Sequence, residues 1–100
     1  MKDLCEKIND FGKGIGNESR YRILEAVLKG QKTVSQLVKS LKLSQPAVSQ
    51  HLKTLKSAKI VVAQRRGQEI FYSANGEYML SLLKNLSTRI EKRKKLKIKK

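Results

Sequence analysis

The side chains best suited to binding chemistry lie in one stretch of the chain that has no carboxylates. Residues 26–68 contain no Asp and no Glu but nine Lys and Arg side chains. Within this stretch, the run from Leu43 to Leu52 carries short polar side chains, among them Ser44 and Gln45, at the start of an expected helix. A nucleic-acid backbone repels carboxylates and binds cations. The pattern therefore predicts a surface that binds duplex DNA.

Cationic side chains around this run are suited to holding phosphates. We expect such contacts from three lysines that flank or follow the start of the helix, Lys42, Lys53 and Lys56. Farther along, Arg65-Arg66-Gly67-Gln68 is expected to form a tight turn, and Arg65, Arg66 and Gln68 at its tip to contact phosphate or the minor groove. His51 could read bases, sense pH, or serve in phosphate contact or packing, and we favour the last of these over a switch.

Helical spacing and cap residues predict the first half of the fold. Apolar residues recur at helical spacing from residue 4 to residue 15 behind an Asp3–Glu6 capping box, and Gly12, Gly14 and Gly16 are expected to end that helix. A second helix is expected from an Asn17 cap to about residue 28, with an apolar face formed by Tyr21, Ile23, Leu24, Val27 and Leu28.

The following segments predict a helix-turn-helix with a wing. Thr33 and Gln36 form a capping box for a third helix, and Ser44 caps a fourth with Pro46 in its first turn. Residues 60–64 and 69–72 are expected to pair as a hairpin about Gly67, and Asn75 to cap a last helix. The expected fold is mainly helical with a two-stranded wing, in the order helix, helix, helix, helix, strand, strand, helix.

This order and three motifs resemble the winged helix-turn-helix repressors of the arsenic-repressor (ArsR/SmtB) family. The first motif is Gly16-Asn17-Glu18-Ser19-Arg20, the second runs from Leu43 to Leu55, and the third is Arg65-Arg66-Gly67-Gln68 followed by Phe71-Tyr72. The resemblance implies that Gln45, Ser49 and Gln50 read base edges. Their chemistry is suitable, because Gln can bond adenine N6 and N7 bidentately and Ser is a short donor and acceptor.

The metal chemistry of that family does not carry over to this sequence. Thr33 and Ser35 stand where its thiol sensors place a Cys-x-Cys pair, and residues 75–92 contain no His, Asp or Cys where its zinc and cobalt sensors place ligands. The whole chain has one His and one Cys, and zinc sites use three or four such ligands. We therefore expect no metal and no other cofactor.

Composition limits the other classes of function. The net charge of +15 is not caused by the basic end alone, since residues 1–90 retain 16 basic and 7 acidic side chains. We expect one domain over residues 1–91 and a basic tail over residues 92–100, which could be a solubilising end or a DNA anchor. Asp3, Glu6 and Asp10 interrupt any signal-peptide pattern, and no apolar run could span a bilayer, so a cytoplasmic protein without membrane contact is expected. No catalytic constellation indicates an enzyme.

The terminal helices carry apolar rows that predict a homodimer. These rows comprise Leu4, Ile8 and Phe11 at one end and Met79, Leu83, Leu86 and Ile90 at the other. A two-fold dimer of such chains would bind an inverted-repeat operator, which indicates a metal-independent transcriptional repressor with an unknown effector. Cys5 could be a small apolar packing residue, which we favour, or a thiol that oxidises against a second Cys5. The alternative function is a winged-helix module that binds protein and uses its charge for solubility or non-specific DNA association.

Overall fold

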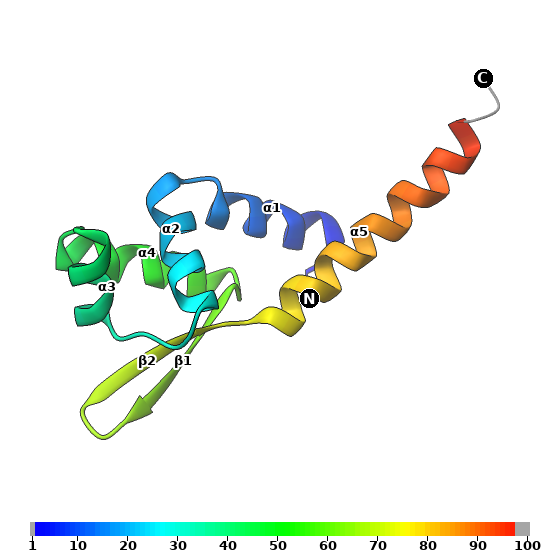
Figure 1. The fold of residues 1–100 in the computed structure, drawn as a ribbon. Helices are drawn as coiled ribbons and strands as arrows, with labels where there is room; N and C mark the ends of the chain where they lie inside the picture. The colour runs from blue at the N-terminus through cyan, green and yellow to red at the C-terminus, as the bar shows by residue number, and fades with distance from the viewer. Residues whose placement is uncertain (1, 98–100) are drawn as a thin grey trace.

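The computed structural model describes residues 2–97, and it describes side chains as far as residue 93. Four helices, α1 (Leu4–Ile15), α2 (Glu18–Leu28), α3 (Val34–Leu41) and α4 (Gln45–Ser57), are followed by strands β1 (Val61–Arg66) and β2 (Glu69–Ala74) and by helix α5 (Gly76–Lys97). Figure 1 shows α1–α4 gathered into one body, with the β1–β2 hairpin projecting from one side and α5 extending away from it. The predicted winged helix-turn-helix is confirmed.

Helix α2 lies at the centre of the body and contacts α1, α3, α4 and β2. Its buried residues are Ile23, Leu24 and Val27. The largest fully buried side chains come from α2 itself, from α3 and α4, and from the start of β1, and they comprise Ile23, Leu37, Val48, Leu52, Leu55, Ile60 and Val61. Tyr21 and Leu28, which were expected on the apolar face of α2, are instead 46% and 57% exposed, because the side chains on these two flanks of the helix find no neighbouring element to cover them.

The helices begin where the sequence predicts. Asp3 and Glu6 form a capping box at α1, and Thr33 and Gln36 form one at α3. Single side-chain caps begin the other three helices at Asn17, Ser44 and Asn75. These bonds satisfy backbone N–H groups that have no partner in the first helical turn, which is why a local sequence pattern is sufficient to place them.

The end of α1 differs from the prediction. Gly12 and Gly14 lie inside the helix, which continues to Ile15, and Gly16 is the residue that ends it, donating from its N–H to the carbonyl of Gly12 (2.8 Å). Gly14 is buried because α1 crosses close to the junction of α4 and β1, where a Cβ on residue 14 would collide with Ile60. Glycine at this position is therefore explained by its packing against Ile60 rather than by a turn.

The hairpin is longer than predicted and gains a third partner. Its register pairs Val61 with Ala74 and Arg66 with Glu69, so Gly67 and Gln68 form a two-residue turn, with a φ of 63° at Gly67. Such turns need a glycine at the first central position when only that residue has positive φ. Lys32 pairs with Tyr72 through two backbone bonds of 2.9 and 2.8 Å, which ties the start of α3 to the outer edge of β2.

Both helices of the helix-turn-helix end in a lysine with left-handed backbone. Lys42 follows α3 with a φ of 56°, and Lys59 follows α4 with a φ of 64°. At the end of α4 the N–H of Ile60 donates to the carbonyl of Leu55 (2.9 Å) and that of Lys59 to Lys56 (3.0 Å). This is the bonding pattern of a Schellman motif, a place that glycine usually occupies.

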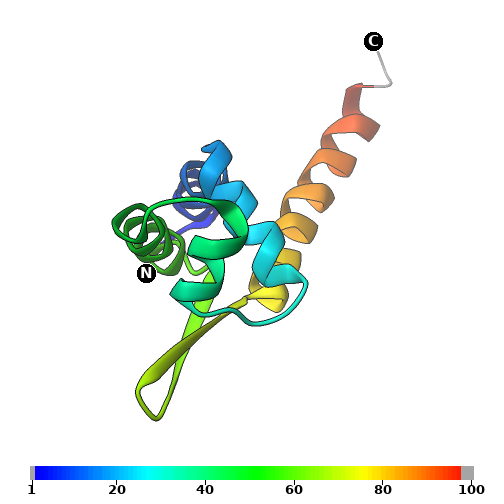
Figure 2. The ribbon, with the colours of Figure 1, turned by 60° about the vertical axis from the view of Figure 1, so that its left-hand side comes forward.

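Helix α5 begins at Gly76, after the Asn75 cap, and runs to Lys97. The boundary predicted between residues 91 and 92 thus falls inside a helix, and residues 98–100 of the predicted tail lie outside the described residues. Figure 2 shows the hairpin and α5 leaving the body in different directions. Among the described residues, no helix is both long enough and apolar enough to cross a membrane.

The crowding at Gly14 predicts a difference between two neighbouring glycines. Gly14→Ala should destabilise the fold by about 1–3 kcal/mol, because the added methyl overpacks the contact with Ile60. Gly12→Ala has open space around its Cβ and should stabilise α1 by about 0.5–1 kcal/mol. Urea unfolding of both variants at one protein concentration measures this, and equal effects of the two substitutions would contradict the packing argument.

Candidate nucleic-acid interface

Helix α4 divides into a buried side and a polar side. Val48, Leu52 and Leu55 are buried in the core. The side chains that project away are exposed and contain no acid; they comprise Gln45, Ser49, Gln50, Lys53 and Lys56. Residues three and four apart share a helix face, so Gln45, Ser49, Lys53 and Lys56 form one continuous row, with Gln50 farther around the helix. The structure thus brings together the predicted base-reading and phosphate-binding residues of this helix.

Ser44, just before α4, has a structural role as well as its predicted role in DNA contact. The Ser44 hydroxyl accepts a hydrogen bond from the N–H of Ala47 (3.2 Å), so this predicted DNA-contact residue is also the helix cap. A hydroxyl that accepts one bond can still donate its proton elsewhere. Lys42, two residues earlier, is exposed, and its left-handed backbone forms the turn between α3 and α4.

The two arginines of the wing lie on opposite faces of the hairpin. Arg66 donates from Nη2 to the Oε1 atoms of Gln31 (3.0 Å) and Gln64 (3.3 Å), and its guanidinium lies 4.9 Å from the centre of the Phe71 ring. Arg65 precedes it on the same strand, so its side chain points to the opposite face of the hairpin. Both arginines and Gln68 at the turn are exposed. Arg66 is therefore held against its own sheet.

The basic side chains of this surface keep their charge unpaired. Among the described side chains, Lys2 and Asp10 form the one ion pair, and both line a cavity with Thr54 and Ser57 at the C-terminal end of α4. Residues 26–68 contain no carboxylate. The one carboxylate of the hairpin, Glu69, lies opposite Arg66 in the register but forms no ion pair within the described side chains, so most of the positive charge of α4 and the hairpin has no local counter-charge. Such a surface attracts polyanions at long range.

His51 lies on the flank of α4 that faces α2. Its Nδ1 atom is 3.5 Å from Nη1 of Arg20, and the ring is half-buried. Burial, and then the nearby Arg20 guanidinium, lower the pKa of His51 below its ordinary value of 6.5. The ring is therefore neutral at pH 7. Its contribution to stability is complete above pH 6.5 and is lost as the pH falls through the lowered pKa, because the unfolded chain binds the proton more readily.

Two arginines of α2 that hold the site together had no role in the sequence prediction. Arg20 donates to the carbonyls of Gly14 (2.9 Å) and Lys13 (2.8 Å) at the end of α1. Arg22 donates to the carbonyl of Leu41 (3.1 Å) at the end of α3. The first of the three sequence motifs ends in Arg20, which was a signal, whereas nothing in the local pattern distinguishes Arg22.

The predicted dimer rows differ in how much surface they leave free. Leu83 and Ile90 on α5 are 43% and 55% exposed, and Leu86 is half-buried. On α1, Leu4, Ile8 and Phe11 are half-buried, and Phe11 packs against the core. Met79 is 8% exposed and belongs to the core of its own chain, so it has little surface left for a second one.

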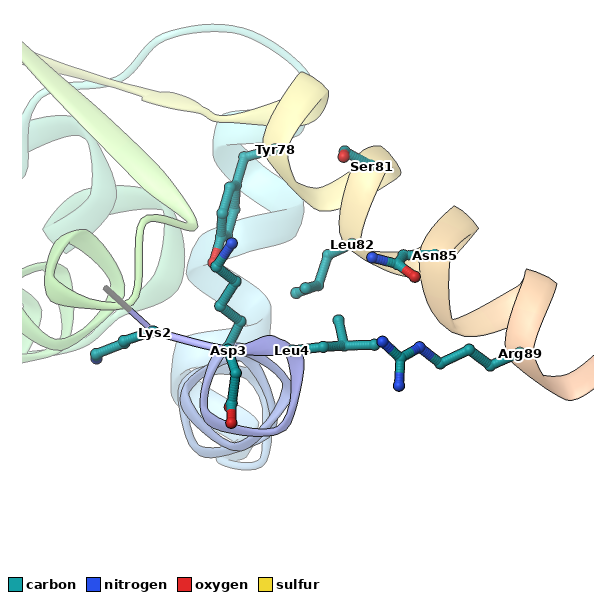
Figure 3. Close-up of a pocket in the computed structure, with 9 residues that line it drawn as sticks. Lys2, Asp3, Leu4, Tyr78, Ser81, Leu82, Asn85 and Arg89 are labelled. Carbon is teal, nitrogen blue, oxygen red and sulfur yellow. The ribbon is translucent and has the colours of Figure 1, made fainter.

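Between α1 and the first half of α5 lies a cavity of about 300 Å³, shown in Figure 3. Tyr78, Ser81, Asn85 and Arg89 line it from α5 opposite Lys2, Asp3, Leu4 and Lys7. Asp3 is its one carboxylate, and that side chain already caps α1. Among the described residues, no three His, Cys, Asp or Glu side chains lie close enough to hold a metal ion.

The positions with thiol or metal-sensing potential are dispersed. Cys5 is an exposed free thiol on α1. Thr33 is buried as the cap of α3, whereas Ser35 is exposed. These side chains do not converge on one site.

Comparison with known proteins gives consistent results. The family described as "Bacterial regulatory protein, arsR family" matches residues 17–62, which span α2 to the start of β1. The solved structure of HlyU from Vibrio cholerae N16961 is 34% identical, with a TM-score of 0.69, 86% of this chain covered and 97% of that chain. A comparison with curated protein sequences found no match.

Two further structures share the fold at lower identity. An ArsR-like transcriptional regulator from Rhodococcus sp. RHA1 has a TM-score of 0.86 at 22% identity, over 90% of this chain and 85% of that one. The homodimeric winged helix-turn-helix DNA-binding domain of Mb0332 from Mycobacterium bovis has a TM-score of 0.73 at 24% identity, over 90% and 83%. Together with the polar, acid-free face of α4 and the adjoining wing, these matches show that the chain belongs to the ArsR family of winged helix-turn-helix transcriptional regulators.

Proposed function

We propose that this regulator binds an inverted-repeat operator as a homodimer and represses transcription by occupying promoter DNA. The observation that carries the proposal is the exposed row of Gln45, Ser49, Lys53 and Lys56 on α4, which is acid-free and backed by a buried apolar side. In a helix-turn-helix the second helix enters the major groove. Gln45, Ser49 and Gln50 would then read base edges, while Lys42, Lys53, Lys56 and the wing hold phosphates.

The dimer is proposed from the surface of α5. Leu83 and Ile90 leave large apolar side chains in water, at a cost of about 25 cal/mol per Å². A two-fold pairing of α5, and of the Leu4–Ile8 edge of α1, would cover them and place two recognition helices one duplex turn apart. The related Mb0332 domain is homodimeric, which supports the same arrangement here.

Metal-independent regulation is proposed from the donor set. Thr33 and Ser35 cannot replace a pair of thiolates, and residues 75–92 offer no His, Asp or Cys. Zinc sensing would need three or four nitrogen, sulfur or carboxylate ligands in one place. The effector that would relieve repression is therefore of another kind.

The proposal is tested by selecting bound duplexes from a pool of random DNA. We expect an inverted repeat with half-sites about one helical turn apart, bound with a strong dependence on salt. Two chains that contact about 6–10 phosphates should lose about 10³–10⁵ in affinity between roughly 50 and 200 mM salt. No enrichment of any sequence, together with salt-independent binding, would favour the protein-interaction alternative.

Two substitutions serve as controls on the selected sequence. Gln45→Ala should cost about 1–3 kcal/mol on the selected duplex and much less on random DNA, because it removes a base contact. Lys53→Ala should weaken both by the same factor. If Gln45→Ala affects both duplexes equally, Gln45 is not a base reader.

The two left-handed lysines provide a test of phosphate binding that spares the fold. Glycine adopts positive φ without strain, so Lys42→Gly removes a charge and keeps the backbone of the turn. It should weaken binding to all duplexes and lower the salt slope by about one per chain. Lys59→Gly is the matched control, since Lys59 has the same backbone conformation but lines a cavity with Lys2 and Lys7 on the α1 side. Equal losses from both variants would show a general charge effect.

The proposed dimer predicts that two Asp substitutions on α5 have different effects on the oligomeric state. Leu86→Asp places a charge in the proposed interface and should produce monomers at micromolar concentration and weaken binding to the inverted repeat. Thr88→Asp introduces the same group on the opposite side of the helix, where Thr88 is exposed, and should remain dimeric. Sedimentation velocity measures both. A dimeric Leu86→Asp variant would place the interface elsewhere.

A further inference from the structure

The guanidinium of Arg20 joins three elements at one point. Its Nε and Nη2 atoms donate to the carbonyls of Gly14 and Lys13 at the end of α1, at 2.9 and 2.8 Å. Its remaining nitrogen, Nη1, lies 3.5 Å from Nδ1 of His51 on α4. The two carbonyl bonds fix the plane of the guanidinium, so the directions of the two Nη1–H bonds are fixed as well.

This geometry determines which nitrogen of His51 carries the proton. Arginine has five donors and no acceptor and does not lose its charge in proteins. The Nδ1 atom facing it must therefore be the unprotonated acceptor, and in a neutral ring the proton then resides on Nε2. Burial and the positive charge of Arg20 both lower the pKa of His51 and keep the ring in this neutral form at pH 7.

The Nε2–H group is available to a partner outside the chain. It has no hydrogen-bond partner within the described residues. Every buried side-chain nitrogen or oxygen among those residues does have a partner, so an atom without one is not buried. The Nε2 atom is therefore open to solvent. His51 lies on the recognition helix, on the flank that faces α2, within the part of the sequence that has no carboxylate.

We propose that Arg20 is a positioning residue that locks His51 in the Nε2–H tautomer, so that His51 donates a neutral hydrogen bond to a DNA phosphate. This assignment rests on the proposed DNA-binding function and adds to it a residue, Arg20, that does not touch DNA. Because the same guanidinium holds the last turn of α1, the orientation of the His51 donor depends on how α1 packs. A lysine at position 20 could bond one carbonyl but could not also present a fixed donor to the ring.

The tautomer can be measured without DNA. His51 is the one histidine in the chain, so ring ¹⁵N NMR of the whole protein at pH 7.5 reports a single ring. We expect a protonated Nε2 and an unprotonated Nδ1, and we expect Arg20→Gln or Arg20→Lys to convert the ring to a mixture of tautomers. A protonated Nδ1, or a ring unchanged in whichever of these variants folds, would overturn the assignment.

Two replacements of His51 distinguish its contact with DNA from its positioning by Arg20. Gln can place its amide N–H near the position of Nε2, whereas Asn can place its carbonyl oxygen near the position of Nδ1. His51→Gln should therefore retain most of the affinity for a bound duplex, and His51→Asn should lose about three- to tenfold per chain, the range for one hydrogen bond. The salt slope should stay unchanged in His51→Asn, because the lost donor is neutral.

A double-mutant comparison completes the test. Arg20→Gln should reduce affinity in the wild-type background and have little further effect in His51→Asn, since Arg20 acts on affinity only through the donor that His51→Asn removes. Additive losses would show that Arg20 acts only through the fold of α1. A salt slope lowered by about one per chain in His51→Asn would show a cationic ring at the phosphate and would also overturn the proposal. If wild-type protein binds no duplex while the NMR result holds, the DNA-binding function fails and the tautomer assignment stands.

Discussion

The close approach of α1 to the junction between α4 and β1 is the contact on which the rest of this site depends. Residue 14 has no side chain, so the helix backbone can lie against Ile60, beside Leu55 and Ala58. The same approach brings the Gly14 carbonyl within 2.9 Å of Arg20 Nε. A larger residue would force either Ile60 or α1 to move, and an outward shift of α1 would lengthen that hydrogen bond. The packing of α1 against Ile60 and the anchoring of the Arg20 side chain beside His51 thus both depend on the absence of a side chain at residue 14.

Helix α2 transmits this arrangement to both helices of the helix-turn-helix. Arg20 bonds the end of α1 and reaches α4, and Arg22 bonds the end of α3 through the Leu41 carbonyl. Hydrogen bonds from a charged donor are about twice as strong as neutral ones. They also satisfy carbonyls that a helix end leaves without partners. The relative positions of α3 and α4 are therefore set by an apolar core and by charged donors that cap the surrounding helix ends.

The sequence predicted what local rules control and missed what distant contacts control. Helix starts followed from caps such as Asp3 and Thr33, whose partners lie three residues away, and the polar face of α4 followed from helical spacing. The buried role of Gly14 could not be predicted, because its neighbour Ile60 is distant in sequence, and glycine alone indicates a helix end as readily. The Lys32–Tyr72 pairing and the bonds of Arg20, Arg22 and Arg66 are equally non-local. Reading of bases by Gln45 and the dimer rows remain predictions.

The lysines at Lys42 and Lys59 show how charge and backbone geometry conflict in this fold. A left-handed conformation costs a residue with a Cβ about 1–2 kcal/mol, and glycine would avoid that cost at either position. A cation at a helix C-terminus regains about 0.3–1 kcal/mol from the helix dipole, which offsets the strain only in part. At Lys42, beside the start of α4, binding a polyanion would compensate for the remainder. Lys59 lines a cavity with Lys2, Lys7 and Asp10, and Asp10 is already paired with Lys2. The proposed DNA binding would thus account for the backbone strain at Lys42, whereas at Lys59 the described side chains supply no ion pair that offsets it.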